Sequence, residues 1–253
     1  MSAEISRQCQ NTGLRLLSAV PGDFGFRITK SKYPATTAPA RANGDRREDW
    51  NRYDAPGQTL YVAEKRECAY AELLSGFKRH LGASDSLLKD AIALDMSISE
   101  FVEELATEWS EKSFMGMGAI PAAWRNDRTI YQVLLPTQGW WVDIEHPDSI
   151  AAIEEKLEQQ LAAEKINHLT TAVLRSDNRI VTTMIAQAVR DLELDDGTRS
   201  HGIHFGSKHG GAWCRAVWLG DEYQGLVATS GEPILLSDDD LKLVADRFRI
   251  KVF

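Results

Sequence analysis

Glu72 is the residue whose surroundings in the sequence best suit it to chemistry. Around it the apolar residues follow a helical period, with a stripe at i, i+3, i+4 and i+7 formed by Tyr70, Leu73, Leu74 and Phe77. At about 100° per residue, the Glu72 side chain projects almost opposite this stripe. Its neighbours on that side are all small: Cys68, Ala69, Ala71, Ser75 and Gly76. Small neighbours let another backbone or a flat ligand approach the carboxylate. The alternative is a solvated glutamate on a surface helix.

Three further residues have side chains that could bind a substrate, and each also has an ordinary structural explanation. Arg52 taken alone would be a surface arginine, since arginine is seldom buried without a partner. Tyr61, in a strand predicted at residues 59–63, would be a half-buried residue that packs against its neighbours in the sheet. Ser207 would be a turn serine in the glycine-rich run GSKHGG at residues 206–211. Residue type and composition alone therefore do not show whether these residues bind a substrate or only stabilise the fold.

The order of these motifs resembles that of the RES domain family, named for its arginine, glutamate and serine. The matching elements are Arg52-Tyr53-Asp54, Gly57, Leu60-Tyr61, Ala69-x-x-Glu72 and Gly202-Ile203-His204-Phe205-Gly206-Ser207. A tryptophan-arginine pair, a strand and a Val-Asp pair within residues 124–143 continue the pattern, so the resemblance covers residues 14–252. Characterised members degrade NAD and serve as toxins of toxin–antitoxin pairs. Their fold is related to that of ADP-ribosyltransferases.

The resemblance implies a role for each of the four residues. Arg52 would hold the diphosphate of NAD through its planar guanidinium, and Ser207 would help to fix it. Tyr61 would offer its ring and hydroxyl to the nicotinamide or its ribose. Glu72 would stabilise the oxocarbenium-like transition state that forms when nicotinamide leaves. The family often has Phe or Trp where this chain has Tyr53, and Arg46 or Arg47 could share the anchoring role of Arg52.

By the same resemblance, the chain is expected to be an NAD glycohydrolase or NAD phosphorylase. NAD is then the substrate and no cofactor is implied. Either water or inorganic phosphate could capture the ribosyl carbon. An Xre-type antitoxin protein is the implied partner. Two other classes stay open: an ADP-ribosyltransferase that modifies a macromolecule, and a catalytically silent binding module with the same fold.

Composition and charge narrow the possible partners. The chain has 253 residues and a formal net charge of −8, which disfavours direct binding to nucleic acid because neutralising phosphates requires clustered Lys and Arg. No apolar run approaches the roughly 18 residues of a membrane span, and no signal peptide is recognised. Cys9, Cys68 and Cys214 are odd in number and widely spaced, which argues against a disulfide framework. We therefore expect a cytoplasmic protein that does not bind membranes.

The sequence lacks the motifs that are typical of several other kinds of site. The run at residues 206–211 lacks the Gly-Lys-Ser/Thr of a nucleoside-triphosphate loop, and no Gly-x-Gly-x-x-Gly follows a strand. A zinc site built from His201, His204, His209 and Cys214 is also disfavoured. Residues three apart on a strand point to opposite faces, and no Cys-x-x-Cys partner exists. His204 is instead expected to help shape the pocket.

These residues must be positioned by one α+β domain covering residues 1–253, with a loose terminus at residues 1–13. We predict an ADP-ribosyltransferase-like fold in which a twisted, mostly antiparallel sheet with flanking helices forms one wall of a cleft and the Glu72 helix another. Residues 21–51 show little periodicity and are predicted to be a functional loop. Strands at residues 129–135 and 140–144 are predicted to form a β-hairpin. Further strands are predicted at residues 14–17, 202–207, 213–218 and 248–252, and helical segments at residues 86–110, 150–161, 180–192 and 237–245.

Overall fold

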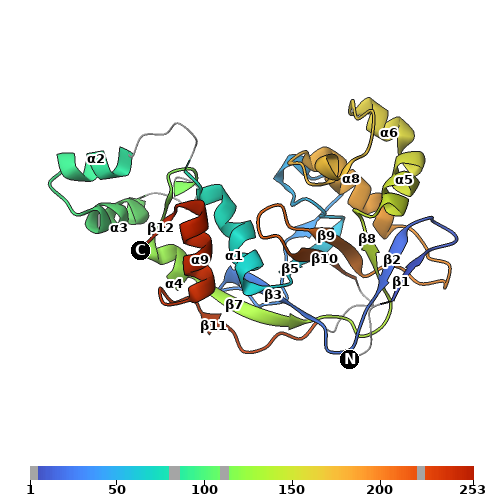
Figure 1. Ribbon diagram of the computed structural model, residues 1–253, viewed down its shortest axis with the longest axis horizontal. Coiled ribbons are helices and arrows are strands. Elements are labelled where there is room, and N and C mark those ends of the chain that lie inside the picture. The colour runs from blue at the N-terminus through green and yellow to red at the C-terminus, as the bar shows by residue number, and fades with distance from the viewer. Residues whose placement is uncertain (1–4, 80–85, 109–113, 221–225) are drawn as a thin grey trace.

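The computed structural model describes residues 5–79, 86–108, 114–220 and 226–253. Within them a ten-stranded, mostly antiparallel sheet is flanked by helices, so the predicted mixed α+β class with one main sheet is confirmed (Figure 1). The strand order along the sheet is β1 (Ser6–Gln8), β2 (Arg15–Ser18), β8 (Trp140–Asp143), β9 (Gly202–Gly206), β10 (Trp213–Leu219), β5 (Gly57–Ala63), β3 (Phe24–Lys30), β7 (Arg128–Leu134) and β11 (Glu232–Pro233), with β4 (Ala40–Arg41) also paired to β5. The pairing of β8 with β9 is parallel, and the other pairings of this sheet are antiparallel.

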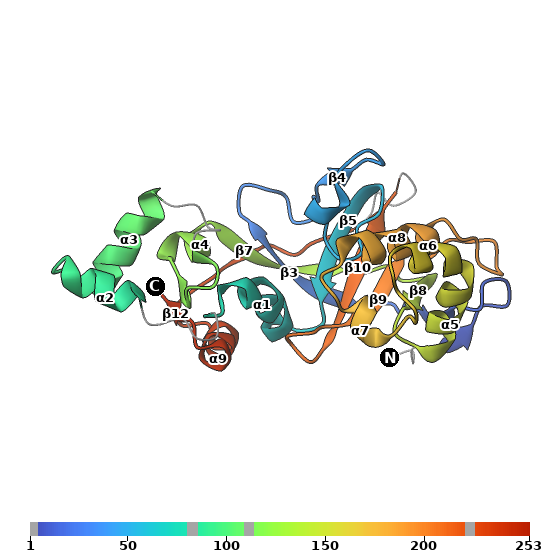
Figure 2. The ribbon, with the colours of Figure 1, turned by 90° about the horizontal axis from the view of Figure 1, so that it is seen from above.

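The helices form two groups at opposite ends of the molecule, and the strands pass between them (Figure 2). One group holds α1 (Arg66–Leu74), which continues as the 3₁₀ turn η2 (Ser75–Phe77), α2 (Ser86–Ala93), α3 (Ile98–Glu108), α4 (Ala122–Asn126) and α9 (Asp239–Phe248). The other holds α5 (Pro147–Lys156), α6 (Glu158–Ala163), α7 (Thr171–Leu174) and α8 (Arg179–Arg190). A 3₁₀ turn, η1 (Arg47–Asp49), packs against α8. The short strands β6 (Ala119–Ile120) and β12 (Lys251–Val252) pair in parallel beside the first group.

The hydrophobic core lies on both faces of the sheet. A large cluster joins α1, α8 and α9 to strands β9 and β10, and includes Tyr70, Ile185, Val244 and Phe205. A smaller cluster on the opposite face includes Leu60, Val62 and Trp141. Because β10 has partners on both edges and buried side chains on both faces, it is the most constrained strand of the sheet. None of the helices in the described part of the chain is both long and apolar enough to cross a membrane.

Helix α1 departs from the predicted amphipathic pattern. Tyr70, Leu74 and Phe77 are buried as predicted, whereas Leu73 is 39% exposed. The small residues on the opposite side, Cys68, Ala69 and Ala71, are also buried, so the helix is enclosed over most of its circumference between β3 and α9. The small side chains therefore serve close packing around Glu72 and do not form a solvated face.

Three sequence predictions are wrong in detail. Residues 21–51 contain the seven-residue strand β3, which pairs with β7 along its whole length. The predicted hairpin does not form, because β9, β10, β5 and β3 lie between β8 and β7 in the sheet. Strand β1 lies within the terminus that was expected to be loose, and it pairs with β2.

Other predicted elements agree, with shifted ends. The predicted helical segment at residues 150–161 is interrupted at Leu157, which separates α5 from α6. The terminal strand is confined to β12, because Phe248 still belongs to α9. Ser97 and Glu100 cap α3 reciprocally through Ser97 Oγ and a Glu100 carboxylate oxygen, as a capping box does. Trp109, predicted on this helix, lies outside the described residues.

His204 gives the fold a pH dependence that can be measured. Its Nδ1 accepts a hydrogen bond from Arg215 Nε at 3.4 Å, and burial together with the Arg215 cation lowers its pKa to about 4. The unfolded chain, with a histidine pKa of about 6.5, therefore binds more protons between about pH 4 and pH 6.5. As the pH falls through this window, the folded state loses about 3 kcal/mol from this residue.

We expect His204→Gln to reduce the loss of stability between pH 7 and pH 4 by about 3 kcal/mol relative to the unsubstituted protein. Urea unfolding at a series of pH values measures this difference. His168→Gln, at a histidine whose side chain is 84% exposed, serves as the control and should leave the pH profile unchanged. Identical pH profiles for His204→Gln and the unsubstituted protein would show that His204 is not buried in its neutral form.

Candidate active site

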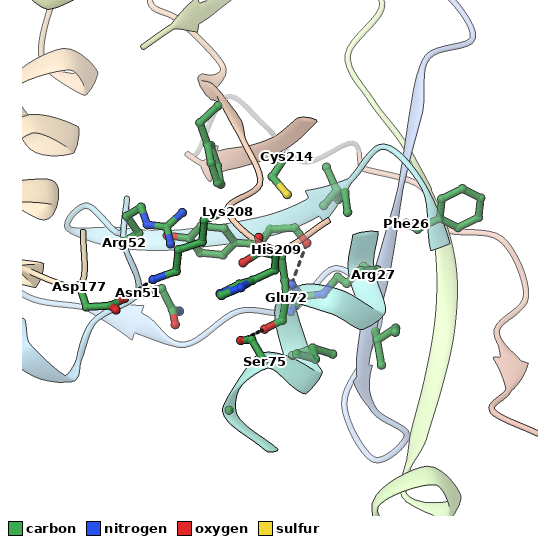
Figure 3. Close-up of a pocket in the computed structure, with 18 of the residues that line it drawn as sticks. Phe26, Arg27, Asn51, Arg52, Glu72, Ser75, Asp177, Lys208, His209 and Cys214 are labelled. Atoms are coloured by element: carbon green, nitrogen blue, oxygen red, sulfur yellow. Dashed lines mark hydrogen bonds and ion pairs between the residues drawn. The ribbon is translucent and has the colours of Figure 1, made fainter. Parts of the chain in front are cut away.

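A pocket of about 610 Å³ lies where α1 meets the sheet, within the size range of small-molecule sites (Figure 3). Of the four residues predicted to form a site, Arg52, Tyr61 and Glu72 line this pocket, and Ser207 touches Glu72. The remaining lining residues come from β3, from β5, β9 and β10, from α1 and η2, from the start of α8, and from three connecting segments: Phe26, Arg27, Ile28, Asn51, Val62, Ala63, Ala69, Leu73, Ser75, Gly76, Asp177, Arg179, Phe205, Lys208, His209 and Cys214.

Glu72 and Ser207 are joined by a hydrogen bond. The Ser207 hydroxyl donates to Glu72 Oε1 at 2.5 Å and accepts from the backbone amides of His209 at 3.1 Å and Gly210 at 2.7 Å. Ser207 is therefore a turn serine and a partner of Glu72 at once. The second carboxylate oxygen of Glu72, Oε2, has no hydrogen-bond partner within the described chain, so it can accept a hydroxyl from a ligand.

Close backbone packing brings this turn to the helix. A side chain at Gly210 would meet the Cα and Sγ atoms of Cys68 at 2.8 Å, so only glycine allows this approach. At Gly206, the end of β9, an added Cβ would lie 2.2 Å from Arg175 Nη2. The two glycines of the run GSKHGG that flank residues 207–209 thus serve packing around Ser207.

Arg52 is a buried cation in the pocket wall. Arg52 is only 7% exposed, and its Nε atom is buried without a hydrogen-bond partner among the described residues. No hydrogen bond or ion pair joins its guanidinium to another residue that the structure describes, and its closest aromatic contact is the Phe205 ring at 5.8 Å. A buried charge without a partner is costly, so an anion in this pocket would remove a substantial penalty.

The segment that carries Arg52 is tied down on both sides of the arginine. Tyr53 is fully buried, packs edge-on against Phe205 and donates its hydroxyl to the Leu174 carbonyl at 2.9 Å. Asp54, 2% exposed, accepts hydrogen bonds from Arg41 Nε, from the Asn51 amide and from the Tyr61 hydroxyl, each at 2.9 Å. Arg52 is thus held in a rigid turn.

Tyr61 serves this turn in a way that the sequence did not indicate. Its hydroxyl donates to Asp54 and accepts from the Tyr53 amide at 3.0 Å, while burial and the Asp54 carboxylate raise its pKa well above the ordinary value. The hydroxyl is therefore engaged by the turn in this structure, and its contact with a ligand stays a prediction. The ring still lines the pocket and can pack against a ligand.

Three more charged residues, which sequence reasoning missed, stand near Arg52. Asp177 Oδ1 accepts from Lys208 Nζ at 2.7 Å and from Arg179 Nη2 at 3.1 Å. The hydrogen bond from Lys208 is the main cause that lowers the pKa of Asp177, and Arg52 acts in the same direction. Figure 3 shows Arg52, Lys208, Asn51 and Asp177 on one side of Glu72, with Phe26 and Arg27 on the other.

Arg27 is a second buried arginine in the wall. It donates to the carbonyls of Tyr61 and Thr37 at 3.3 and 2.9 Å, and its Nε is buried without a partner within the described residues. Burial lowers its pKa to about 10, so it remains charged at neutral pH. The sequence did not indicate Arg27 as a site residue, because residues 21–51, which contain β3, are predicted to be a loop.

The alternative anchors Arg46 and Arg47 do not line the pocket. Arg46 is exposed, and Arg47 donates to Thr183 and Gln187 of α8. Of the arginines in this stretch of sequence, Arg52 is the one at the pocket.

The histidines considered for a metal site are spread apart. His204 lies beside Arg215 and Trp213 and does not line the pocket, which corrects the expected pocket-shaping role. His201 contacts the Gln138 carbonyl at 2.5 Å. His209 lines the pocket, and burial lowers its pKa while Glu72 acts in the opposite direction. The described residues contain no group of three His, Cys, Asp or Glu side chains arranged to hold a metal ion.

Comparison of the chain with models of protein families, with curated protein sequences and with solved structures gives no match. The evidence for a function of this protein therefore comes from its sequence motifs and from the geometry of the pocket.

If the Arg52 guanidinium binds an anion, inorganic pyrophosphate should bind to the protein. Arg52→Lys should weaken that binding about tenfold or more, because lysine cannot make the bidentate contact. Isothermal titration calorimetry measures the two affinities. Arg47→Lys is the matched control and should bind as the unsubstituted protein does, since Arg47 contacts α8. Equal binding by Arg52→Lys and the control would remove Arg52 from the anion site.

Proposed function

We propose that this protein cleaves NAD at the bond between nicotinamide and ribose, by hydrolysis or phosphorolysis. The observation that carries the proposal is the placement of a buried, unpaired arginine, Arg52, in the same pocket as the carboxylate of Glu72. An anionic substrate that develops positive charge during its reaction needs both groups. The resemblance to RES domains, whose characterised members degrade NAD, supports the same reading.

The distribution of side chains around Glu72 suits a dinucleotide. Arg52 lies on one side of Glu72 with Lys208 and Asp177, and Arg179 is paired with the same aspartate, so three cations and one anion leave this side net positive and able to hold the diphosphate. Phe26, on the other side of Glu72 in Figure 3, offers an apolar surface to a flat nicotinamide ring, and Ile28, Val62 and Leu73 are further apolar residues of the pocket lining. Glu72 lies between the two sides in Figure 3, where the ribose that links them would be.

The chemistry follows from the leaving group. In NAD the nicotinamide is a positively charged pyridinium, so breaking the N-glycosidic bond sends the electron pair to the ring nitrogen and leaves positive charge on the ribose. A carboxylate beside the ribose stabilises that charge. Glu72 can act through its field and by accepting a ribose hydroxyl at Oε2. Ser207, which holds Oε1, keeps the carboxylate oriented.

The acceptor decides the second product. Attack by water on the ribosyl carbon yields ADP-ribose and releases a proton, whereas attack by inorganic phosphate yields ADP-ribose phosphorylated at that carbon. Arg27, a second buried arginine in the pocket lining, lies on the same side of Glu72 as Phe26, where its guanidinium can bind a phosphate ion. Turnover that rises with phosphate concentration would identify phosphorolysis, and turnover that ignores phosphate would identify hydrolysis.

The fold and the biological role belong to the same proposal. A mostly antiparallel sheet with its pocket between β5, β9, β10 and α1 is compatible with the ADP-ribosyltransferase-like fold of RES domains. We propose a toxin that acts in the cytoplasm and is restrained by an Xre-type antitoxin protein covering the pocket. The chain's net charge of −8 favours an inhibitor with basic residues on its contact surface.

Glu72→Gln should lower NAD cleavage about 10²-fold or more, because it keeps the volume of the side chain but removes its charge. The amide can still accept a hydrogen bond from Ser207, so the thermal midpoint should hardly change. Glu67→Gln, on the same helix but paired with Arg247 at 2.7 Å outside the pocket, is the matched control and should retain activity. Full activity of Glu72→Gln would remove this residue from catalysis, and loss of folding would return it to a structural role.

Expression of the protein in growing cells should deplete NAD and arrest growth, whereas the Glu72→Gln form should do neither. Cellular NAD and growth are measured together, with immunoblotting to equalise the two protein levels. Unchanged NAD during strong expression of the folded protein would contradict the toxin role.

A further inference from the structure

Cys68 and Cys214 form a thiol pair beside the candidate site. The sulfur of Cys68, near the start of α1, lies 3.7 Å from the sulfur of Cys214 on β10, although 146 positions separate them in the sequence. Both cysteines are buried and both are free thiols. Since the sulfurs are already in contact, a small shift is enough to bring them within bonding distance.

A small oxidant can reach the pair through the pocket. Cys214 lines the pocket wall, as Figure 3 shows, whereas Cys68 is fully buried, so a molecule of the size of a peroxide reaches the pair at Cys214. The hydrogen bond between the two sulfurs is the main cause that lowers the pKa of Cys68 and raises that of Cys214. A lowered pKa favours the thiolate, the nucleophilic form of cysteine.

The pair is packed against the groups that orient Glu72. Cys68 precedes Glu72 by one helical turn. Its Cα and Sγ atoms press against Gly210, where no Cβ would fit. The Gly210 amide donates to Ser207, and Ser207 donates to Glu72. A displacement at Cys68 is thus passed through two contacts to the carboxylate.

We propose that Cys68 and Cys214 form a reversible disulfide that breaks the contact between Ser207 and Glu72 and so switches the site off. The consequence for catalysis rests on the proposed function, whereas the disulfide itself does not. The oxidant is a peroxide. Cys214, which lines the pocket, passes its thiol proton to the Cys68 thiolate and attacks one peroxide oxygen. A sulfenic acid forms on Cys214, and the other oxygen leaves as hydroxide, which takes that proton back and becomes water. The Cys68 thiolate then attacks the sulfur of the sulfenic acid, the S–S bond forms and the S–O bond breaks, and the hydroxide that leaves takes a proton from solvent to become a second water.

The direction of the movement follows from the constraints on each element. A disulfide needs its sulfurs about 2.05 Å apart, so they must approach by more than 1 Å from their separation of 3.7 Å. Strand β10 is held by hydrogen bonds to β5 and β9 on its two edges, so α1 is the element that yields. The turn at residues 207–210 connects the paired strands β9 and β10 and packs directly on that part of α1, so the movement of α1 pushes against the turn and separates Ser207 from Glu72.

The test begins with hydrogen peroxide as the probe. The purified protein is oxidised, its remaining thiols are alkylated, and the peptides are analysed without reduction by mass spectrometry. We expect a crosslink between the peptides of Cys68 and Cys214, reversed by dithiothreitol, in the unsubstituted protein and in the control Cys9→Ala. Cys68→Ala should give no such crosslink. Absence of the crosslink in folded, unsubstituted protein would overturn the proposal.

Two measurements test whether the disulfide between Cys68 and Cys214 changes the candidate site. Hydrogen exchange of the peptide that covers residues 207–210 should become faster on oxidation, because the amides held by Ser207 lose their acceptor. NAD cleavage should fall at least about tenfold on oxidation and recover on reduction, on the scale of a displaced stabilising group. Cys68→Ala should show the same exchange and the same turnover with and without peroxide. A crosslink that changes neither readout would overturn the switch. Absence of NAD cleavage in the reduced protein would instead contradict the proposed function, and hydrogen exchange would still decide the coupling.

Discussion

The candidate site depends on one hydrogen bond, from the Ser207 hydroxyl to Glu72 Oε1, which joins positions 135 residues apart in the sequence. For this bond to form, the turn after β9 must lie directly on α1, and the glycine at 210 allows that approach. The adjacent pairing of β5 with β10 brings the two elements together, since α1 follows β5 and the turn precedes β10. The bond leaves Oε2 of Glu72, a residue that lines the pocket, without a hydrogen-bond partner among the described residues.

The second constraint is the burial of Arg52. A guanidinium enclosed without a hydrogen bond to a carboxylate among the described residues lowers the stability of the protein, so the surrounding segment must hold it in place. The Asp54 carboxylate does this by gathering donors from β4, from Asn51 and from Tyr61 on β5. The site therefore consists of a rigid turn that carries an unsatisfied cation and a rigid helix that carries an oriented carboxylate. Under the proposed function, such a pair would bind an anionic substrate without rearranging.

Sequence reasoning succeeded where the signal is local. The strand β5, the helices α1 and α8 and the strands β9 and β10 follow from short-range periodicity, and three of the motif residues do line one pocket. It failed where the outcome depends on distant partners. The alternation of Phe24, Phe26 and Ile28 could have indicated β3, but prolines and charged residues around it suggested a loop. Which strands pair is decided by the whole sheet, so proximity in sequence wrongly implied a hairpin of β7 with β8. No spacing rule could have placed Cys68 against Cys214, because the wide spacing and odd number of the cysteines argue only against a disulfide framework.

The most direct test of the account is to incubate the purified protein with NAD and to identify the products by liquid chromatography and mass spectrometry, in buffers with and without inorganic phosphate. The account predicts one equivalent of free nicotinamide for each NAD consumed, together with ADP-ribose or its phosphorylated form. Recovery of intact NAD after prolonged incubation with folded, reduced protein in both buffers would contradict it.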